Sequence, residues 1–328
     1  WLAGGRDRVA REGFAGLTTA SPQMGRLARW YRTLLHWPDA QLGWVRSAKR
    51  AGRTLMRSQR FDLIYVSAAP LSALRVGARL SDEFGVPWVA ELRDLWTDNH
   101  AYAYPAWRRA IERTWESRLL GSAAAIVTVS APLAAKLSHH GRPVWEIRNG
   151  YDPQDTADWP APEATPADEL RVVYTGSVYP GHQDTETFCA GIALFSALGG
   201  RVRVIAVGRD LATLARSATR HRVSHLFEIL PTVPRLEALR LQRSADLLLT
   251  FLWQGSEEGI YTTKFFEYAG AGRPMLAIGS RTGDVARWIE QSALGSVAST
   301  DTEVEEALNM WLKRKASAGS LSVQAIMR

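Results

Sequence analysis

The segment 257–279 carries an amine and a carboxylate at a spacing that suits binding of a phosphorylated ligand. Thr262 and Thr263 stand where the N-cap of a short helix belongs, and Lys264 follows them directly. If Thr263 is the N-cap, the capping-box position is Phe266. The carboxylate of Glu267 then does not cap the N-terminus of its own helix and stays available for a ligand. A free carboxylate there can accept hydrogen bonds from two ribose hydroxyls. The helix start and the amine of Lys264 together suit a diphosphate.

A plainer interpretation of these residues stays open. Glu267 could serve only to stabilise its helix by interacting with the helix dipole, and Lys264 could be an ordinary solvated side chain.

A second anion site is predicted where the strand LRVVYTG runs into the loop SVYPGHQD. Gly176, Ser177 and a second glycine would let the backbone approach an anion before the next helix begins near Thr185. The loop is neither GxGxxG nor GxxxxGK[ST], which argues against a nicotinamide dehydrogenase and against a phosphate-loop ATPase. An ordinary strand-to-helix turn remains the alternative for this loop.

Composition sets the class of protein that must position these groups. A chain of 328 residues with 46% hydrophobic and 22% charged residues is long enough for two soluble globular domains. Its longest apolar stretches, such as residues 245–253, fall well short of the roughly 20 residues of a membrane-spanning helix. The single Cys189 has no partner in the chain and no histidine or cysteine cluster around it. A disulfide framework and a thiolate zinc site are therefore excluded, and the cysteine content fits a reducing compartment best.

The positive charge is concentrated at one end of the chain. Residues 1–60 hold twelve Arg and Lys against three Asp and Glu, a net charge of +9, whereas the other 268 residues hold twenty-eight against thirty. Trp30, Trp37 and Trp44 lie among these basic residues. This pattern favours an anionic partner, either an acidic membrane surface or nucleic acid. A solvated arginine-rich helical face, with the tryptophans in the core, is the alternative.

Helices and short apolar strands alternate along the chain. We expect helices in residues 24–60, then strands at FDLIYVS, PWVAEL, AAIVTVS and PVWEI with helices between them, one over 106–120 and one capped by Ser130. The stretch between Tyr151 and Asp168 is rich in Pro, Asp and Ala, which is typical of a linker. The alternation restarts at LRVVYTG and continues through RVRVIAVG, FEIL, ADLLLTFLW and PMLAIG.

This order predicts an α/β protein with two doubly wound, Rossmann-like domains facing a cleft. We place an N-terminal domain at residues 1–152, a linker at 153–168, and a C-terminal domain with a helical tail at 169–328. The opening stretch begins with Trp and has no obvious first strand, so we expect the N-terminal domain to be incomplete.

The segment TKFFEYAGAGRPMLA resembles the nucleotide-binding signature of GT-B glycosyltransferases, specifically the large retaining family four. Further stretches match in the expected order, namely FDLIYVSAAP, PWVAELRDLW, AAIVTVSAPLAAKL, EIRNGYDP, VVYTGSVYPG and ADLLLTF. The resemblance extends over residues 38–278. Each motif is short, but their recurrence across two domains makes the set moderately specific.

The resemblance implies that Glu267 holds the ribose of a nucleotide sugar, with Lys264 and the backbone around Thr263 and Phe265 on its phosphates. Gly176 and Ser177 would line the same phosphates, and Asn149 with Gly150 would form the turn at the domain junction.

In the N-terminal domain, the resemblance implies that Arg93 and Asp94 face the acceptor and the transferred sugar. A local ion pair that fixes the loop is the alternative for these two residues. His100 follows in the same loop and could bind the acceptor or transfer a proton. The alternative is a side chain that only faces solvent.

The chain departs from the family pattern in three places. The family often has a Glu eight positions before its ribose-binding Glu, but Gly259 stands there and the neighbouring Glu258 is only a shifted candidate. The basic residue expected soon after Gly176 is missing, so charge compensation would rest on Lys264, His182 or Arg209. The family's opening strand and glycine-rich loop are not recognisable, which raises the question of whether this chain is active without them.

The resemblance therefore implies a retaining glycosyltransferase of hexosyltransferase type that moves a sugar from a nucleoside diphosphate sugar to a saccharide or lipid-linked acceptor in cell-surface polysaccharide synthesis. It implies no cofactor, no metal and no nucleic-acid partner, and a cytoplasmic location, peripheral on the inner face of the membrane if residues 1–60 bind an anionic surface. The alternatives are a sugar-nucleotide 2-epimerase and a non-catalytic protein that binds membrane or nucleic acid and keeps a vestigial cleft.

Overall fold

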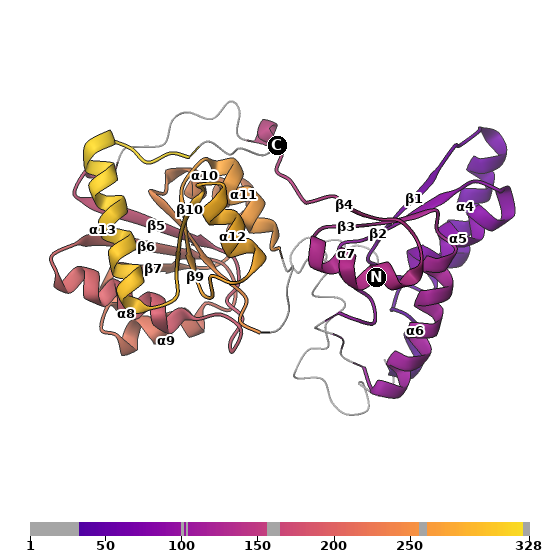
Figure 1. Cartoon of the computed structure of the whole chain (residues 1–328), viewed down its shortest axis with the longest axis horizontal. Helices are drawn as coiled ribbons and strands as arrows, with labels where there is room; N and C mark the ends of the chain where they lie inside the picture. The colour runs from indigo at the N-terminus through magenta and orange to yellow at the C-terminus, as the bar shows by residue number, and fades with distance from the viewer. Residues whose placement is uncertain (1–32, 100–101, 103, 156–164, 256–260, 324–328) are drawn as a thin grey trace. The chain divides into compact units, whose positions relative to one another are not determined.

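The structure is a computed structural model that describes residues 33–99, 102, 104–155, 165–255 and 261–323. The chain divides into two compact units, Trp1–Arg148 and Asn149–Arg328. Each contains one parallel β-sheet with helices packed against it, and each is described by itself below (Figure 1).

The first unit contains a four-stranded sheet in the order β1-β2-β3-β4. Its strands are β1 (Ile64–Ala68), β2 (Trp88–Leu92), β3 (Ala125–Thr128) and β4 (Val144–Glu146), and its helices are α4 (Trp44–Ser58), α5 (Ser72–Phe84), α6 (Ala106–Gly121) and α7 (Ala131–Leu137), followed by a 3₁₀ turn at Ser138–His140. All neighbouring strands are parallel, as helix-connected strands require.

The described residues of the first unit bury one face of this sheet. Val66 and Trp88 alternate along β1 and β2 with less buried neighbours, and together with Ile126 of β3 they pack with the helices in a single core. On the opposite face, Tyr65 is 52% exposed and Trp145 is 62% exposed. β1 and β2 therefore alternate with period two, whereas β3 is buried on both sides at Ile126 and Val127.

The second unit contains a six-stranded parallel sheet in the order β10-β9-β8-β5-β6-β7. Its strands are β5 (Glu169–Thr175), β6 (Arg201–Val207), β7 (Phe227–Leu230), β8 (Leu247–Phe251), β9 (Met275–Ile278) and β10 (Gly295–Ala298). Its helices are α8 (Thr185–Ala197), α9 (Ala212–Arg220), α10 (Arg235–Ser244), α11 (Thr263–Ala271), α12 (Asp284–Gln291) and α13 (Asp301–Ala318), with 3₁₀ turns at Pro153–Asp155 and Ser224–Leu226.

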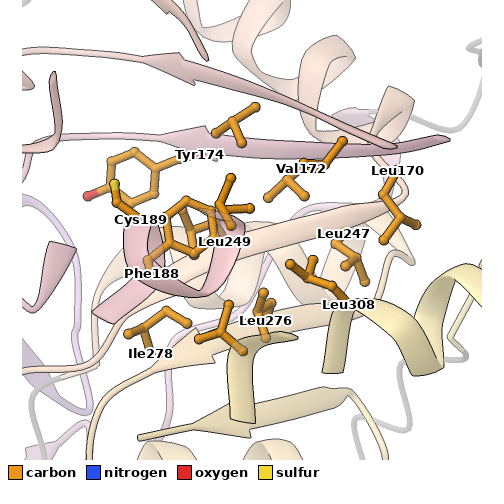
Figure 2. Packing of buried hydrophobic residues seen from close by; sticks show 14 of the residues in the cluster. Leu170, Val172, Tyr174, Phe188, Cys189, Leu247, Leu249, Leu276, Ile278 and Leu308 are labelled. Atoms are coloured by element: carbon orange, nitrogen blue, oxygen red, sulfur yellow. The ribbon is translucent and has the colours of Figure 1, made fainter. Parts of the chain in front are cut away.

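Two cores lie on the two faces of this sheet. One joins β5, β8 and β9 to α8, α9 and α13, and Figure 2 shows part of it, including Val172 of β5, Phe188 of α8 and Leu308 of α13. The other core joins the opposite strand face to α10, α11 and α12. Strands buried on both sides explain why their sequences are continuous apolar runs.

The two sheets confirm the predicted class of α/β protein with parallel sheets. In the second unit, β5 lies between β6 and β8, so the order of the strands reverses at the β5–β8 pair. Ligands of open α/β sheets bind beyond the carboxyl ends of the strands at such a reversal. The end of β5 is therefore where the predicted site residues must be sought.

Candidate functional site

Helix α11 begins at Thr263, and the preceding Thr262 is its N-cap. Of the two threonines that the sequence offers as N-cap, Thr262 takes the position: its backbone is extended, which is the conformation of an N-cap residue, and that of Thr263 is already helical. The side chain of Thr263 lies outside the described residues. The described side chain of Thr262 makes no capping hydrogen bond, so the first backbone N–H groups of the helix are not occupied by it. At the other end, Gly272 closes the helix in the left-handed conformation that favours glycine.

Lys264 reaches from the first turn of α11 to the end of β5. Its Nζ donates a hydrogen bond to the Tyr174 hydroxyl at 2.9 Å and lies 4.4 Å from the centre of that ring. No described carboxylate pairs with it, and burial lowers the pKa of Lys264 to about 8. An amine that is half-buried and lacks a described counter-ion gains most from an anionic ligand.

Two glycines allow this close approach at the ends of β5 and β6. A Cβ atom on Gly176 would lie 2.7 Å from the Nζ of Lys264, and a Cβ on Gly208 would lie 2.1 Å from the carbonyl oxygen of Gly176. Both glycines have positive φ, +133° and +151°. Conformation therefore favours glycine at both positions, and at Gly208 the nearby backbone also leaves no space for a side chain.

Glu267 lies one turn after Lys264 on α11, and its side chain is 23% exposed. Its Oε2 accepts a hydrogen bond from Gln242 Nε2 at 3.4 Å, and its Oε1 lies 3.8 Å from Arg235 Nε. A cavity of about 20 Å³ beside it is also lined by Tyr151. The carboxylate is thus neither free in bulk water nor sealed in the core, and it keeps an exposed side on which hydroxyl groups can bind.

Buried hydrogen bonds fix α10 and α11 to the end of β5. The Thr175 backbone N–H donates to the Tyr268 hydroxyl at 2.8 Å, and Gln242 Nε2 donates to the Thr175 hydroxyl at 2.9 Å. Because Gln242 also contacts Glu267, one carboxamide connects the strand end to the predicted ribose-binding carboxylate.

The other predicted residues of the second unit lie at the same edge of the sheet. Ser177 follows Gly176, and its carbonyl oxygen accepts the Tyr174 hydroxyl at 2.7 Å. Arg209 follows β6, is exposed, and has no ion pair with a described residue. Phe265 is buried in the core under α11, so only its backbone can contact a ligand.

Some predicted site residues do not belong to the described part of the second unit. Arg93 and Asp94 are exposed at the end of β2, in the first unit, which is described separately. His100 and Glu258 lie outside the described residues, as does Trp30. Their predicted roles remain predictions.

Sequence reasoning missed the partners of the two central side chains. Tyr174 is the hydrogen-bond acceptor of Lys264, and Gln242 and Arg235 contact Glu267. Tyr174 stands two residues before Gly176, within a strand that reads as core, and Gln242 and Arg235 belong to a different helix. No spacing in the sequence relates them to α11, because only the fold brings these elements together.

Comparison with known proteins gives a match to one family model, almost entirely within the first unit, and a fold for most of the chain. Residues 6–150 match the model of the glycosyl transferase 4-like domain. A comparison with curated proteins gives no match.

Similar solved structures include HepE from Anabaena in complex with UDP, with 16% identity, a TM-score of 0.61, and coverage of 85% of this chain and 75% of that one. They also include sucrose-phosphate synthase from Thermosynechococcus elongatus, with 15% identity, a TM-score of 0.56, and coverage of 87% and 73%. The lipopolysaccharide outer core galactosyltransferase WaaB in its apo form has 10% identity, a TM-score of 0.56, and coverage of 84% and 73%.

At these identities the structures establish only the fold, and the family model supplies the class of domain. The chain therefore has the GT-B fold and resembles the family-four glycosyltransferases, with a glycosyl transferase 4-like domain at residues 6–150.

Proposed function

We propose that the protein transfers a sugar from a nucleoside diphosphate sugar to a saccharide or lipid-linked acceptor in the synthesis of a cell-surface polysaccharide. The observation that carries this proposal is the amine of Lys264, held at the uncapped start of α11 against the glycine that ends β5. The binding of UDP in HepE, a protein of the same fold, supports the same class of donor.

The chemistry of such a donor fits these groups. When the bond to the sugar breaks, negative charge grows on the departing diphosphate while the sugar becomes oxocarbenium-like. Lys264 and the N–H groups of α11 would stabilise that charge, and Glu267 would hold the ribose and so fix the position of the nucleotide.

The finer features of the reaction follow from the family resemblance. We propose retention of configuration by same-face attack, without a covalent nucleophile and without a metal, since Lys264 and the helix start supply the positive charge. Arg93 and Asp94 would face the acceptor, with His100 and Glu258 as further candidates.

The acceptor is proposed to lie at an anionic membrane surface on the cytoplasmic side. Helix α4 has five basic residues and no acidic one, and its Trp44 and Leu55 side chains are 51% and 53% exposed. WaaB, which shares the fold, acts on lipopolysaccharide according to its name. Within the part of the chain that the structure describes, no helix is both long and apolar enough to cross a bilayer.

A panel of nucleotide sugars tests the proposal. We expect one member to raise the thermal unfolding temperature by mass action, and NMR of the same donor with saccharide acceptors to show a new glycosidic linkage. Lys264→Ala should lower kcat/KM by about 10²–10³-fold, because it removes charge stabilisation in the transition state. Glu267→Gln should weaken donor binding by about tenfold.

The matched control is Lys313→Ala, which removes an exposed lysine from α13 and should leave kcat/KM unchanged. Conversion of the nucleotide sugar without any acceptor would instead favour a 2-epimerase. A protein that binds no nucleotide sugar but retains binding to membrane or nucleic acid would be the non-catalytic alternative.

A further inference from the structure

Helix α6 of the first unit buries three charged side chains along one side. Arg108, Glu112 and Glu116 follow one another at intervals of four residues, and they are only 0%, 1% and 4% exposed. Charged side chains are almost never buried to this degree unless they are paired. This row of charges therefore needs an explanation other than hydrophobic packing.

The two carboxylates of this row bind the loop that follows β2. Oε2 of Glu112 accepts hydrogen bonds from Trp96 Nε1 at 2.9 Å and from the Tyr102 hydroxyl at 3.0 Å. Oε2 of Glu116 accepts from the Thr97 backbone N–H at 3.3 Å and also from the Thr97 hydroxyl. Because both the backbone and the side chain of Thr97 are bound to one carboxylate, α6 fixes the loop at this residue.

The fixed part of the loop adjoins its two exposed charged side chains. Leu95, Trp96 and Thr97 are buried, whereas Arg93 and Asp94, directly before them, are exposed. Strand β2 lies between β1 and β3, and ligands of open α/β sheets bind beyond the carboxyl ends of the strands. The bonds to Trp96 and Thr97 therefore determine the place from which Arg93 and Asp94 can reach a ligand.

Glu116 differs from Glu112 in its lack of a cationic partner. Arg108 Nε donates to Glu112 Oε1 at 2.7 Å, so these two buried charges neutralise each other. Within the described chain, no lysine or arginine forms an ion pair with Glu116, and burial raises the pKa of its carboxyl group. A glutamine of the same shape would avoid the cost of burying this charge. The carboxylate instead gives Thr97 two charge-assisted hydrogen bonds, which are stronger than neutral ones.

The titratable groups around Glu116 come from the loop and from the 3₁₀ turn at Ser138–His140. Asp98 and His139 act on Glu116 through their charges, and Asp98 is itself paired with Arg113. The His140 ring stacks on that of His139 with centroids 3.9 Å apart, and burial lowers the pKa of His140 to about 4. The substitution Glu116→Gln leaves all of these groups in place, so it isolates the effect of the carboxylate.

We propose that Glu116 is a positioning residue for acceptor binding, because its carboxylate holds Thr97 and thereby presents Arg93 and Asp94 to the acceptor. This inference rests on the proposed function, which gives Arg93 and Asp94 their role. Glu116 acts only through the loop and touches no substrate. Its loss should therefore weaken acceptor binding and leave donor binding unchanged, since Lys264 and Glu267 belong to the other unit.

The experiment compares Glu116→Gln and Glu116→Leu with a matched control in the same unit. The control is Glu83→Gln, which removes a carboxylate from a partly exposed ion pair with Arg53 on the helices α4 and α5. Hydrogen exchange of residues 93–99, followed by mass spectrometry, measures whether the loop is held. Calorimetry measures the affinity for UDP-glucose, UDP-galactose and UDP-N-acetylglucosamine, and transfer assays measure KM for the methyl glycosides of glucose, galactose, mannose and N-acetylglucosamine. Thermal unfolding verifies that each variant is folded.

Glu116→Leu should speed exchange in residues 93–99 by about tenfold, as expected for the loss of hydrogen bonds to a charged group. It should raise KM for the accepted methyl glycoside by about threefold to tenfold and leave the affinity for the UDP-sugar unchanged. In the wild type, exchange relative to the intrinsic rate should increase as the pH falls from about 7 to about 5, because protonation of Glu116, whose pKa is raised, weakens its bonds to Thr97. Glu116→Gln has no carboxylate to protonate, so its profile should be flat.

Equal exchange of residues 93–99 in wild type, in folded Glu116→Leu and in Glu83→Gln overturns the proposal. Faster exchange in Glu116→Leu with an unchanged KM also overturns it, because Glu116 would then be a structural residue only. A pH profile as steep in Glu116→Gln as in the wild type would assign the change to the neighbouring histidines instead. Wild-type protein that binds no UDP-sugar and transfers no sugar would contradict the proposed function, while the exchange profiles would still decide whether Glu116 holds the loop.

Discussion

Among single residues, the chemistry of the second unit centres on an amine with an unusual environment. Lys264 has a hydroxyl partner in Tyr174 and no described carboxylate, and burial disfavours its charged form. Its charge therefore changes near neutral pH instead of far above it. If this amine holds a diphosphate, the affinity for the diphosphate must fall as Lys264 loses its charge.

We predict that UDP binding weakens by about tenfold between about pH 7.5 and pH 9. The pKa of Lys264 is lowered to about 8, so the ammonium that attracts the diphosphate is present below this pH and is lost above it. Calorimetric titration of UDP across this range measures the effect, with the nucleotide's own phosphate ionisation subtracted from a titration without protein.

Lys264→Arg gives the control, because a guanidinium stays charged throughout this range and its binding should be flat above about pH 7.5. Tyr174→Phe removes the hydroxyl acceptor that favours the charged amine, so the midpoint should move to lower pH. A wild-type profile as flat as that of the arginine variant would show that this amine does not hold the phosphate.

Among the helices and strands, the site depends on helices that are fixed to strand ends by buried polar groups. Thr175, Tyr268 and Gln242 fasten α10 and α11 to β5 at its carboxyl end. At the opposite end of β5, Lys315 of α13 is 1% exposed and donates to Asp246 at 2.8 Å and to the Glu169 carbonyl at 2.5 Å. The first set positions the site, and the second holds the last helix against the sheet.

We predict that Lys315→Met destabilises the second unit by about 3–5 kcal/mol, because it leaves the carboxylate of Asp246 buried without its cation. Urea unfolding followed by circular dichroism measures the change. The double variant Lys315→Met/Asp246→Leu should recover most of the loss.

The matched control is Arg79→Met, which breaks an exposed pair with Asp82 on α5 and should change stability by no more than about 0.5 kcal/mol. Equal effects of the buried and the exposed substitution would show that the Lys315 pair contributes nothing particular to the fold.

Across the molecule as a whole, the charge is divided unevenly, with a net charge of +9 in residues 1–60 against +7 for the entire chain. On α4, a spacing of about 100° per residue places Arg46, Arg50 and Arg57 on one flank and Trp44 and Leu55 on another. An anionic bilayer would attract the first flank electrostatically and accept the second into its interface.

We predict that the protein binds vesicles with about 30% phosphatidylglycerol and not vesicles of phosphatidylcholine alone, and that Arg50→Glu/Arg57→Glu weakens binding by at least about tenfold. Co-sedimentation at two salt concentrations measures this, since the attraction must fall as salt rises. Arg216→Glu/Lys313→Glu makes the same charge change at exposed positions of the second unit and should retain binding. Equal loss in the two double variants would attribute binding to net charge rather than to α4.

Local signals in the chain are enough to predict the alternation of helices and strands, the parallel sheets and the position of the short helix with Lys264 and Glu267. Hydrophobic periodicity, capping residues and glycines are such signals, and α11 begins where the TTK segment indicates and ends at Gly272. The alternating burial of β1 and β2 was not predictable, because a short apolar strand has the same sequence pattern whether one of its faces is covered or both.

Which side chains meet is settled by the packed fold alone. Tyr174 and Lys264 are separated by ninety residues in the chain, and Gln242 and Glu267 by twenty-five, yet the side chains of each pair form a hydrogen bond. Such pairings depend on the order of strands in the sheet, which places β5 beside β8 although three α-helices and two strands lie between them in the chain. Strand order is set by long-range packing, and no local pattern of residues records it.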